Sequence, residues 1–206
     1  MNVHSVSGSV LRREREKQER RAAIMAAAEQ VIVRQGFTEA SIDGIAREAG
    51  LAAGTVYLYF PNKEALFQEL WCNKVRLLNS AVAAQTKPDR PFAEGVRAVV
   101  RAMLLHFEEH RGFFEIFVRA RMDMCRGVSQ SKGVLQEIQA GTDHLTRWIR
   151  AAQRAKELAP GEPRLRAVAL RGLVFQFTRD WLRSGCVGRL TKYAAFVTEF
   201  FMKGAA

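Results

Sequence analysis

Two short patterns in the sequence contain residue types that can catalyse a reaction or bind a metal ion. His106, Glu109 and His110 form H-x-x-E-H, in which two imidazoles one helical turn apart can share a zinc ion. Ser129 and Lys132 form S-x-x-K, the spacing of a serine nucleophile and a lysine base, but no K-T-G or S-D-N follows. Because so short a pattern is weak in a helical chain rich in glutamate, we interpret the histidines as surface residues. The prediction is no catalytic residue, no bound metal and no cofactor.

The cysteines give little support to a redox or metal site. Cys72, Cys125 and Cys186 lie far apart, form no C-x-x-C pair and cannot all pair within one chain. This usage is typical of a reduced, cytoplasmic protein. Cys125 has a basic neighbour but no resolving cysteine nearby in the sequence. A metal- or redox-responsive site, and a helical metalloenzyme using His106 and His110, stay open as alternatives.

A different kind of chemistry is indicated by residues 41–60, whose pattern predicts two short helices joined by a glycine-led turn. Ser41 can cap the first helix, its apolar positions recur at helical spacing, and Gly50 ends it. Thr55 to Phe60 form the second helix, after a very short connector over residues 51–54. Small residues in the first helix let the two helices cross closely. This is the helix-turn-helix pattern, whose second helix enters the major groove of DNA.

The stretch 18–78 resembles the DNA-binding domain of the TetR family of bacterial transcription regulators. The resemblance covers less than a third of the chain, but its matches keep fixed spacings. It implies a homodimer that binds a palindromic double-stranded DNA operator and responds to a small-molecule effector as a repressor. The alternatives within the same fold are an activator and a metal- or redox-responsive regulator. The matching residues are Ala22–Ala28, Gly36-Phe37, Ser41-Ile42-x-x-Ile45-Ala46-x-x-Ala49-Gly50, Gly54-Thr55-Val56-Tyr57-x-Tyr59-Phe60 and Asn62-Lys63-Glu64-x-Leu66.

The resemblance also implies which residues contact DNA. The hydroxyls of Thr55, Tyr57 and Tyr59 lie on or beside the groove-facing side, where they can bond phosphate oxygens or base edges. Leu58 is placed to touch a thymine methyl group. For each tyrosine, half-buried packing stays open as an alternative. The full predicted DNA-binding set is Ser41, Arg47, Ala53, Gly54, Thr55, Tyr57, Leu58, Tyr59 and Lys63.

The predicted recognition helix departs from many relatives, because it contains no lysine or arginine. Where those relatives carry basic or hydroxyl residues, this chain has Ala52 and Ala53. Phosphate contacts must then come from Lys63, Arg47 and the basic residues between Arg12 and Arg21. We expect Lys63→Ala to weaken binding to all DNA sequences and to lower the salt slope by about one.

The elements that position these residues are all predicted to be helical. The predicted organisation is a flexible basic arm over 1–17, a DNA-binding domain over 18–78 and a ligand-binding and dimerisation domain over 79–206. Glycines and prolines divide the chain into about nine helices, with no period-two alternation long enough for a strand. Besides the elements above, we expect one helix ending near Gln35 and another that starts at Lys63 with Asn62 as its possible N-cap. Further helices are expected over 92–109, 113–124, 134–157, 164–184 and 190–202, with a polar loop over 127–133.

The second domain contains two apolar stripes and a set of aromatic residues. Stripes on the last two helices predict a dimer interface formed by Leu170, Val174, Phe177, Trp181, Phe196 and Phe200, with burial in the monomer's own core as the alternative. An effector pocket is predicted among Met103, Phe107, Phe114, Phe117, Arg121, Trp148 and Phe175, although such residues also form ordinary cores.

Composition and charge limit the classes of protein and ligand that the sequence allows. The chain has 206 residues, 48% of them hydrophobic and 26% charged, which is typical of a globular protein. No apolar stretch is long enough for a membrane span and no secretory signal is visible, so no membrane partner is expected. The net charge is +11, of which residues 75–206 contribute +10. This surplus suggests an anionic amphiphile paired with Arg119 or Arg121, or else a solvated basic face.

Overall fold

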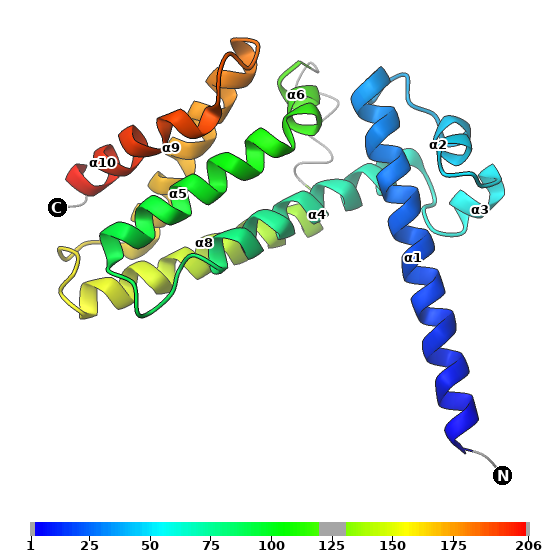
Figure 1. Cartoon of the computed structure of the whole chain (residues 1–206), viewed down its shortest axis with the longest axis horizontal. Helices are drawn as coiled ribbons and strands as arrows, with labels where there is room; N and C mark the ends of the chain where they lie inside the picture. Colours follow the sequence, from blue (N-terminus) through cyan, green and yellow to red (C-terminus); the bar gives the residue numbers. More distant parts are fainter. Residues whose placement is uncertain (1–2, 120–130, 205–206) are drawn as a thin grey trace. The chain divides into compact units, whose positions relative to one another are not determined.

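The computed structural model describes residues 3–119 and 131–204, and the side chains of residues 10–116 and 131–204. This part of the chain contains nine α-helices, one short 3-10 helix and no strand (Figure 1). The prediction of an all-α chain with about nine helices is confirmed. The chain divides into two compact units, Met1–Leu70 and Trp71–Ala206, which are described separately below.

Unit 1 contains α1 (Val3–Gln35), α2 (Ile42–Glu48), α3 (Ala53–Tyr57) and the first turns of α4 (Lys63–Ala83). Its helices pack on one apolar core because each has a buried face at helical spacing. The division from unit 2 falls after Leu70, inside α4, whereas the sequence predicts a boundary after residue 78. The core side chains include Ile24, Ala28, Ile32, Ile45, Val56, Phe60, Leu66 and Phe67.

The first helix begins much earlier than the sequence suggests. A flexible arm is predicted over residues 1–17, but α1 starts at Val3. Its alternating charges form pairs one turn apart, with 3.4 Å between Arg12 Nε and Glu16 Oε1 and 2.9 Å between Arg15 Nε and Glu19 Oε1. Each exposed pair of this kind stabilises a helix by about 0.3–0.5 kcal/mol.

Unit 2 contains the rest of α4 and the later helices. These are α5 (Phe92–Glu109), α6 (Arg111–Arg119), α8 (Lys132–Arg154), α9 (Pro163–Arg183), the 3-10 helix η1 (Leu190–Tyr193) and α10 (Ala194–Gly204). The prediction for 92–109 is confirmed. Gly112, predicted to separate two helices, lies inside α6, and Gly133, predicted to be in a loop, lies inside α8. Residues 120–130, which include the end of one predicted helix and most of that loop, lie outside the described residues.

The start of α9 shows how local sequence sets an element boundary. Pro163 occupies the first turn, where its missing N–H removes no helical hydrogen bond. Glu162 is the N-cap, and its Oε1 accepts a hydrogen bond of 3.0 Å from the backbone N–H of Arg164. At the far end, the indole of Trp181 donates a hydrogen bond of 2.9 Å to the carbonyl of Gly188, which ties the following loop back to α9.

Across the described residues, none of the helices combines the length and the apolar character that a membrane span requires.

Candidate DNA-binding interface

The first helix of the predicted motif, α2, is fixed by its cap and its buried face. Ser41 is extended at the N-cap, and its Oγ accepts a hydrogen bond of 3.1 Å from the N–H of Gly44. This satisfies one of the free N–H groups at the helix start. Ile42, Ile45 and Ala46 are buried. The predicted capping role of Ser41 is therefore confirmed.

The turn after α2 is a Schellman motif. Gly50 has φ +66°, in the left-handed region that favours glycine, and its N–H bonds the carbonyl of Arg47 at 3.1 Å. The N–H of Leu51 bonds the carbonyl of Ala46 at 2.9 Å. These two hydrogen bonds close α2 and reverse the chain within a few residues. The prediction that a glycine-led turn joins two short helices is correct.

The second helix, α3, presents exposed side chains on a buried support. It begins at Ala53 and includes Gly54, both of which were predicted to lie in the connector, and it ends at Tyr57. Val56 is completely buried, whereas Tyr57 is 54% exposed and Leu58 84% exposed. The exposed side chains of Tyr57 and Leu58 therefore form a partly apolar surface next to the buried Val56.

Arg21 of α1 holds the chain just after α3. Its Nη1 donates a hydrogen bond of 3.2 Å to the carbonyl of the half-buried Tyr59, and its guanidinium lies 4.4 Å from the ring centroid of Phe60. Its Nη2 is also 3.4 Å from Glu69 Oε2. The sequence places Arg21 among residues available to phosphates, but the structure uses it to position the end of α3.

Lys63 has a similar internal role. Its Nζ donates hydrogen bonds of 2.8 Å and 3.1 Å to the carbonyls of Phe37 and Thr38, and it lies 4.6 Å from the centroid of the Phe37 ring. Beside it, Asn62 Oδ1 accepts a hydrogen bond of 2.7 Å from the N–H of Ala65, which confirms the predicted cap of α4. An ammonium has three donors, so one remains for a phosphate. The predicted DNA contact of Lys63 stays a prediction.

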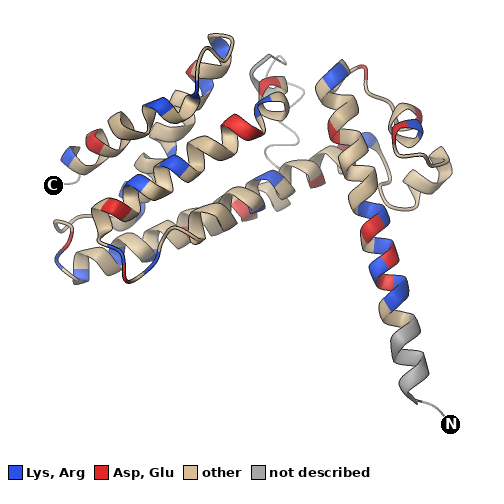
Figure 2. Ribbon diagram, viewed as in Figure 1, with Lys and Arg blue, Asp and Glu red and all other residues tan. Residues whose placement is uncertain are grey.

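Charge is distributed unevenly over unit 1. Figure 2 shows Lys and Arg alternating with Asp and Glu along the middle of α1, while α3 carries neither. Arg47 on α2 is exposed, and the neighbouring Glu48 is paired with Arg34 at 2.6 Å. The basic residues nearest to α3 in the sequence are therefore Arg47 and Lys63.

The histidine pattern lies in unit 2, and one histidine is not at the surface as predicted. His106 is buried, and its ring centroid lies 4.7 Å from that of His110. Burial, with the positive charges of His110 and Lys74, lowers the pKa of His106 to about 4. Glu109 is exposed. Among the described residues no group of three or more His, Cys, Asp or Glu side chains could hold a metal ion.

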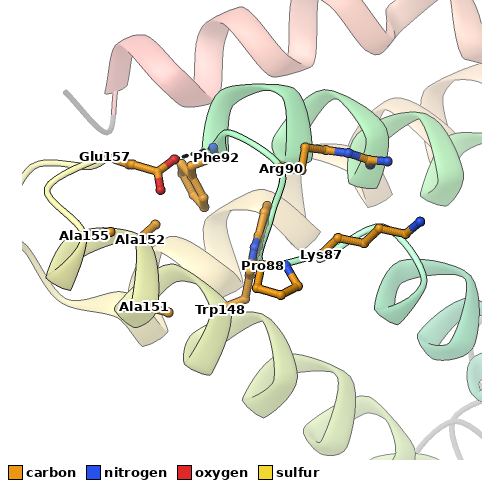
Figure 3. A pocket seen from close by; sticks show the side chains of 9 residues that line it. All are labelled: Lys87, Pro88, Arg90, Phe92, Trp148, Ala151, Ala152, Ala155 and Glu157. Atoms are coloured by element: carbon orange, nitrogen blue, oxygen red, sulfur yellow. Dashed lines mark hydrogen bonds between the residues drawn. The ribbon is translucent and has the colours of Figure 1, made fainter.

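Three of the predicted pocket residues belong to the core of unit 2. Met103, Phe107 and Phe114 are buried, and the rings of the two phenylalanines pack against each other at 4.8 Å. Trp148 lines a separate hollow (Figure 3). Phe175 is 54% exposed on α9 and so does not line the interior of unit 2, which corrects the prediction. The side chains of Phe117, Arg119, Arg121 and Cys125 lie outside those that the structure describes.

The predicted dimer residues fall into two groups. Leu170, Val174 and Trp181 are buried in the core of their own unit, so the alternative interpretation is correct for these three. Phe196 and Phe200 on α10 are 56% and 57% exposed. The half-buried Phe177 connects the two groups, with its ring 5.7 Å from that of Phe196.

Comparisons with known proteins agree with this geometry. Residues 24–70 match the pattern of bacterial regulatory proteins of the tetR family. The chain is 30% identical over 137 residues to the HTH-type transcriptional regulator TtgW of Pseudomonas putida, covering 66% of this chain and 95% of TtgW. It is 24% identical to the HTH-type regulator YhgD of Bacillus subtilis, covering 79% and 84% of the two chains. The solved structure of FadR from Bacillus subtilis in complex with stearoyl-CoA superposes with a TM-score of 0.76 at 20% identity, covering 90% and 99%.

The fold and these matches define a transcriptional regulator with an N-terminal helix-turn-helix. More specifically, the chain belongs to the TetR family of bacterial regulatory proteins.

Proposed function

We propose that this regulator is a homodimeric repressor that binds a near-palindromic operator through α2 and α3 and is released by a small-molecule effector. The observation that carries the proposal is the exposure of Tyr57, the last residue of α3, and of Leu58, its C-cap, next to the buried Val56. In a helix-turn-helix, the second helix lies in the major groove with its side chains against base edges.

The exposed side chains at the end of α3, Tyr57 and the C-cap Leu58, are uncharged and can contact DNA by hydrogen bonding and apolar packing. The Tyr57 hydroxyl can bond a phosphate or a base edge, and Leu58 can pack on a thymine methyl group. Because α3 has no cation, phosphate contacts come from Arg47, from Lys63 and from the exposed basic residues of α1. We therefore expect a moderate salt dependence, since the slope counts the phosphates that are neutralised.

A second copy of the chain is the proposed occupant of the exposed apolar residues of α9 and α10. On α9 these are Leu165, Val168 and Phe175, spaced as in one face of a helix, and on α10 they are Phe196 and Phe200. A two-fold axis through these helices gives a four-helix interface and two recognition helices. An operator with two related half-sites then follows.

The effector acts by shifting a population between two dimer conformations. It binds better to the conformation whose two recognition helices do not fit successive grooves, and this difference in affinity sets the extent of release. The similarity of fold to FadR, which was solved with stearoyl-CoA, supports a small-molecule effector. The surplus of positive charge in residues 75–206 favours an acidic effector.

The DNA-binding part of the proposal is tested by fluorescence anisotropy with a duplex selected by the protein from a random pool. Leu58→Asp should lower affinity at least tenfold, because it places a carboxylate against bases and phosphates. Leu135→Asp is the matched control, since Leu135 is an exposed leucine on α8 of unit 2. Equal affinities of the two variants would contradict the proposed role of α3.

The dimer is tested by light scattering after size-exclusion chromatography. The double variant Phe196→Glu, Phe200→Glu should be monomeric, and Leu135→Glu should remain a dimer. A wild-type chain that is monomeric at micromolar concentration would contradict this part of the proposal.

A further inference from the structure

The N-terminal part of α1 is a helical segment that contributes no side chain to the core of unit 1. Every side chain from Val10 to Arg20 is exposed, whereas the buried residues of this helix begin at Ile24. At 1.5 Å per residue the exposed segment is about 16 Å long. Figure 1 shows α1 extending beyond α2 and α3 in this direction. The segment is therefore open to a partner along its length.

The acidic side chains of this segment are engaged within the helix. Glu16 pairs with Arg12 at 3.4 Å, and Glu19 pairs with Arg15 at 2.9 Å. Glu14 Oε1 accepts a hydrogen bond of 3.2 Å from a glutamine side chain one turn later. The two ion pairs offset the charges of the two arginines that take part in them.

Three basic residues lie outside these pairs and form a stripe along α1. Arg13, Lys17 and Arg20 make no hydrogen bond or ion pair with any residue that the structure describes. Their spacing of four and then three residues places them on one face of the helix. The stripe is bordered by Glu14 and Glu16, whose carboxylates bond other side chains. It presents three positive charges over about 10 Å of helix axis.

The stripe begins close to the end of the proposed recognition helix. Lys17 is one helical turn before Arg21 and therefore on the same side of α1. Arg21 Nη1 donates a hydrogen bond of 3.2 Å to the carbonyl of Tyr59, two residues after the end of α3. Both helices belong to the same compact unit. The stripe is therefore continuous with the surface that contains the exposed Tyr57 and Leu58.

We propose that Arg13, Lys17 and Arg20 bind phosphates of the DNA backbone beside the bases that α3 contacts. This inference rests on the proposed function, because it takes duplex DNA as the partner. Successive phosphates of one strand are about 3.4 Å apart along the axis, so the stripe spans about three of them. Such contacts carry no sequence information, but they fix the register of the protein on the duplex. They supply the positive charge that α3 lacks.

The experiment measures affinity for the selected duplex by fluorescence anisotropy at a series of salt concentrations. The stripe variant is Arg13→Gln, Lys17→Gln, which preserves the helix because glutamine has nearly the helix propensity of arginine and lysine. The slope of log affinity against log salt should fall by about two per bound protomer, since each phosphate contact contributes about 0.9. Arg150→Gln, Arg154→Gln is the matched control, because it removes two exposed arginines, also four residues apart, from α8 of unit 2. Its slope should equal that of wild type.

Two further measurements separate the stripe from the total charge of α1. Arg12→Gln, Arg15→Gln removes the same charge from the same helix, but from residues that are paired with glutamates. It should lower the slope by less than half as much as the stripe variant does. On an unrelated duplex of equal length, the stripe variant should lose affinity by the same factor as on the selected duplex, because both duplexes offer the same phosphates.

The outcomes distinguish failure of the stripe from failure of the proposed function. If wild type binds the selected duplex and the stripe variant keeps the slope of the α8 control, the stripe is overturned and the proposed function stands. Equal losses of slope in the stripe variant and in Arg12→Gln, Arg15→Gln would overturn the assignment to one face. A wild-type protein that binds both duplexes equally, with a slope that falls in the stripe variant, overturns sequence recognition by α3 and supports the stripe. A wild-type protein that binds neither duplex overturns both.

Discussion

The buried histidine of α5 makes the stability of unit 2 dependent on pH. Burial and two basic neighbours lower the pKa of His106 to about 4 in the folded chain, against 6.5 for an unperturbed histidine. Between these two values the unfolded chain binds a proton that the folded chain does not. The free energy of unfolding is therefore highest above pH 6.5, falls as the pH drops towards 4, and levels off below it.

The size of the loss follows from the two pKa values. Each unit of difference corresponds to about 1.4 kcal/mol, so the full loss is about 3 kcal/mol, most of it reached by pH 4.5. The assay is urea unfolding followed by tryptophan fluorescence, at pH 7.5, 6.5, 5.5 and 4.5. Trp71, Trp148 and Trp181 all belong to unit 2, so the signal reports this unit.

His106→Gln removes the titrating group and should flatten the profile relative to wild type. His144→Gln is the control, because His144 is only partly buried and bonds Thr86 Oγ1 at 2.8 Å. It should keep most of the wild-type pH dependence, although burial also lowers the pKa of His144. Parallel profiles of wild type and His106→Gln between pH 6.5 and 4.5 would refute the reasoning.

Three further predictions concern unit 1. Arg21→Ala should weaken operator binding severalfold and lower stability by about 1 kcal/mol, because the Tyr59 carbonyl loses its donor, whereas Arg20→Ala, an exposed neighbour, should leave stability unchanged in thermal unfolding. Lys63→Ala should lower the slope of log affinity against log salt by about one, and an unchanged slope would exclude a phosphate contact. Gly50→Ala should lower the free energy of unfolding by about 1–2 kcal/mol, because Gly50 has a positive φ. Gly54→Ala should leave it unchanged, because a Cβ at this position of α3 meets open space. Similar unfolding curves for the two variants would contradict the assigned turn geometry.

The helix-turn-helix could be predicted because its determinants are local. The Ser41 cap reaches a backbone N–H three residues away, and the Gly50 turn bonds carbonyls within the preceding turn of helix. The contacts of Arg21 and Lys63 join positions 38 and 26 residues apart. No spacing rule in the sequence indicates such partners, so their internal roles were missed.

The face of α9 is a case that sequence alone could not resolve. Apolar residues occur around much of this helix, so periodicity does not tell which stripe is internal. The structure buries Leu170 and Val174 and exposes Val168 and Phe175. Packing against the other helices of unit 2 determines which face of α9 is buried. This packing depends on the whole unit and not on the sequence of α9 alone.

Aromatic composition does not separate a core from a cavity, so the sequence could not tell which of the predicted pocket residues simply fill the core of unit 2. Phe107 and Phe114 fill each other's space, whereas small residues create the hollow next to Trp148. A signal was available in the alanines at 151, 152 and 155 that follow this tryptophan by helical spacing.

Recognition of DNA by paired α3 helices can be measured by hydroxyl-radical footprinting of the wild-type protein on its selected duplex. We expect two protected regions related by two-fold symmetry, with centres about one helical turn or a small multiple of it apart, both lost in Leu58→Asp. A single asymmetric region, or an unchanged footprint in Leu58→Asp, would contradict recognition by paired α3 helices.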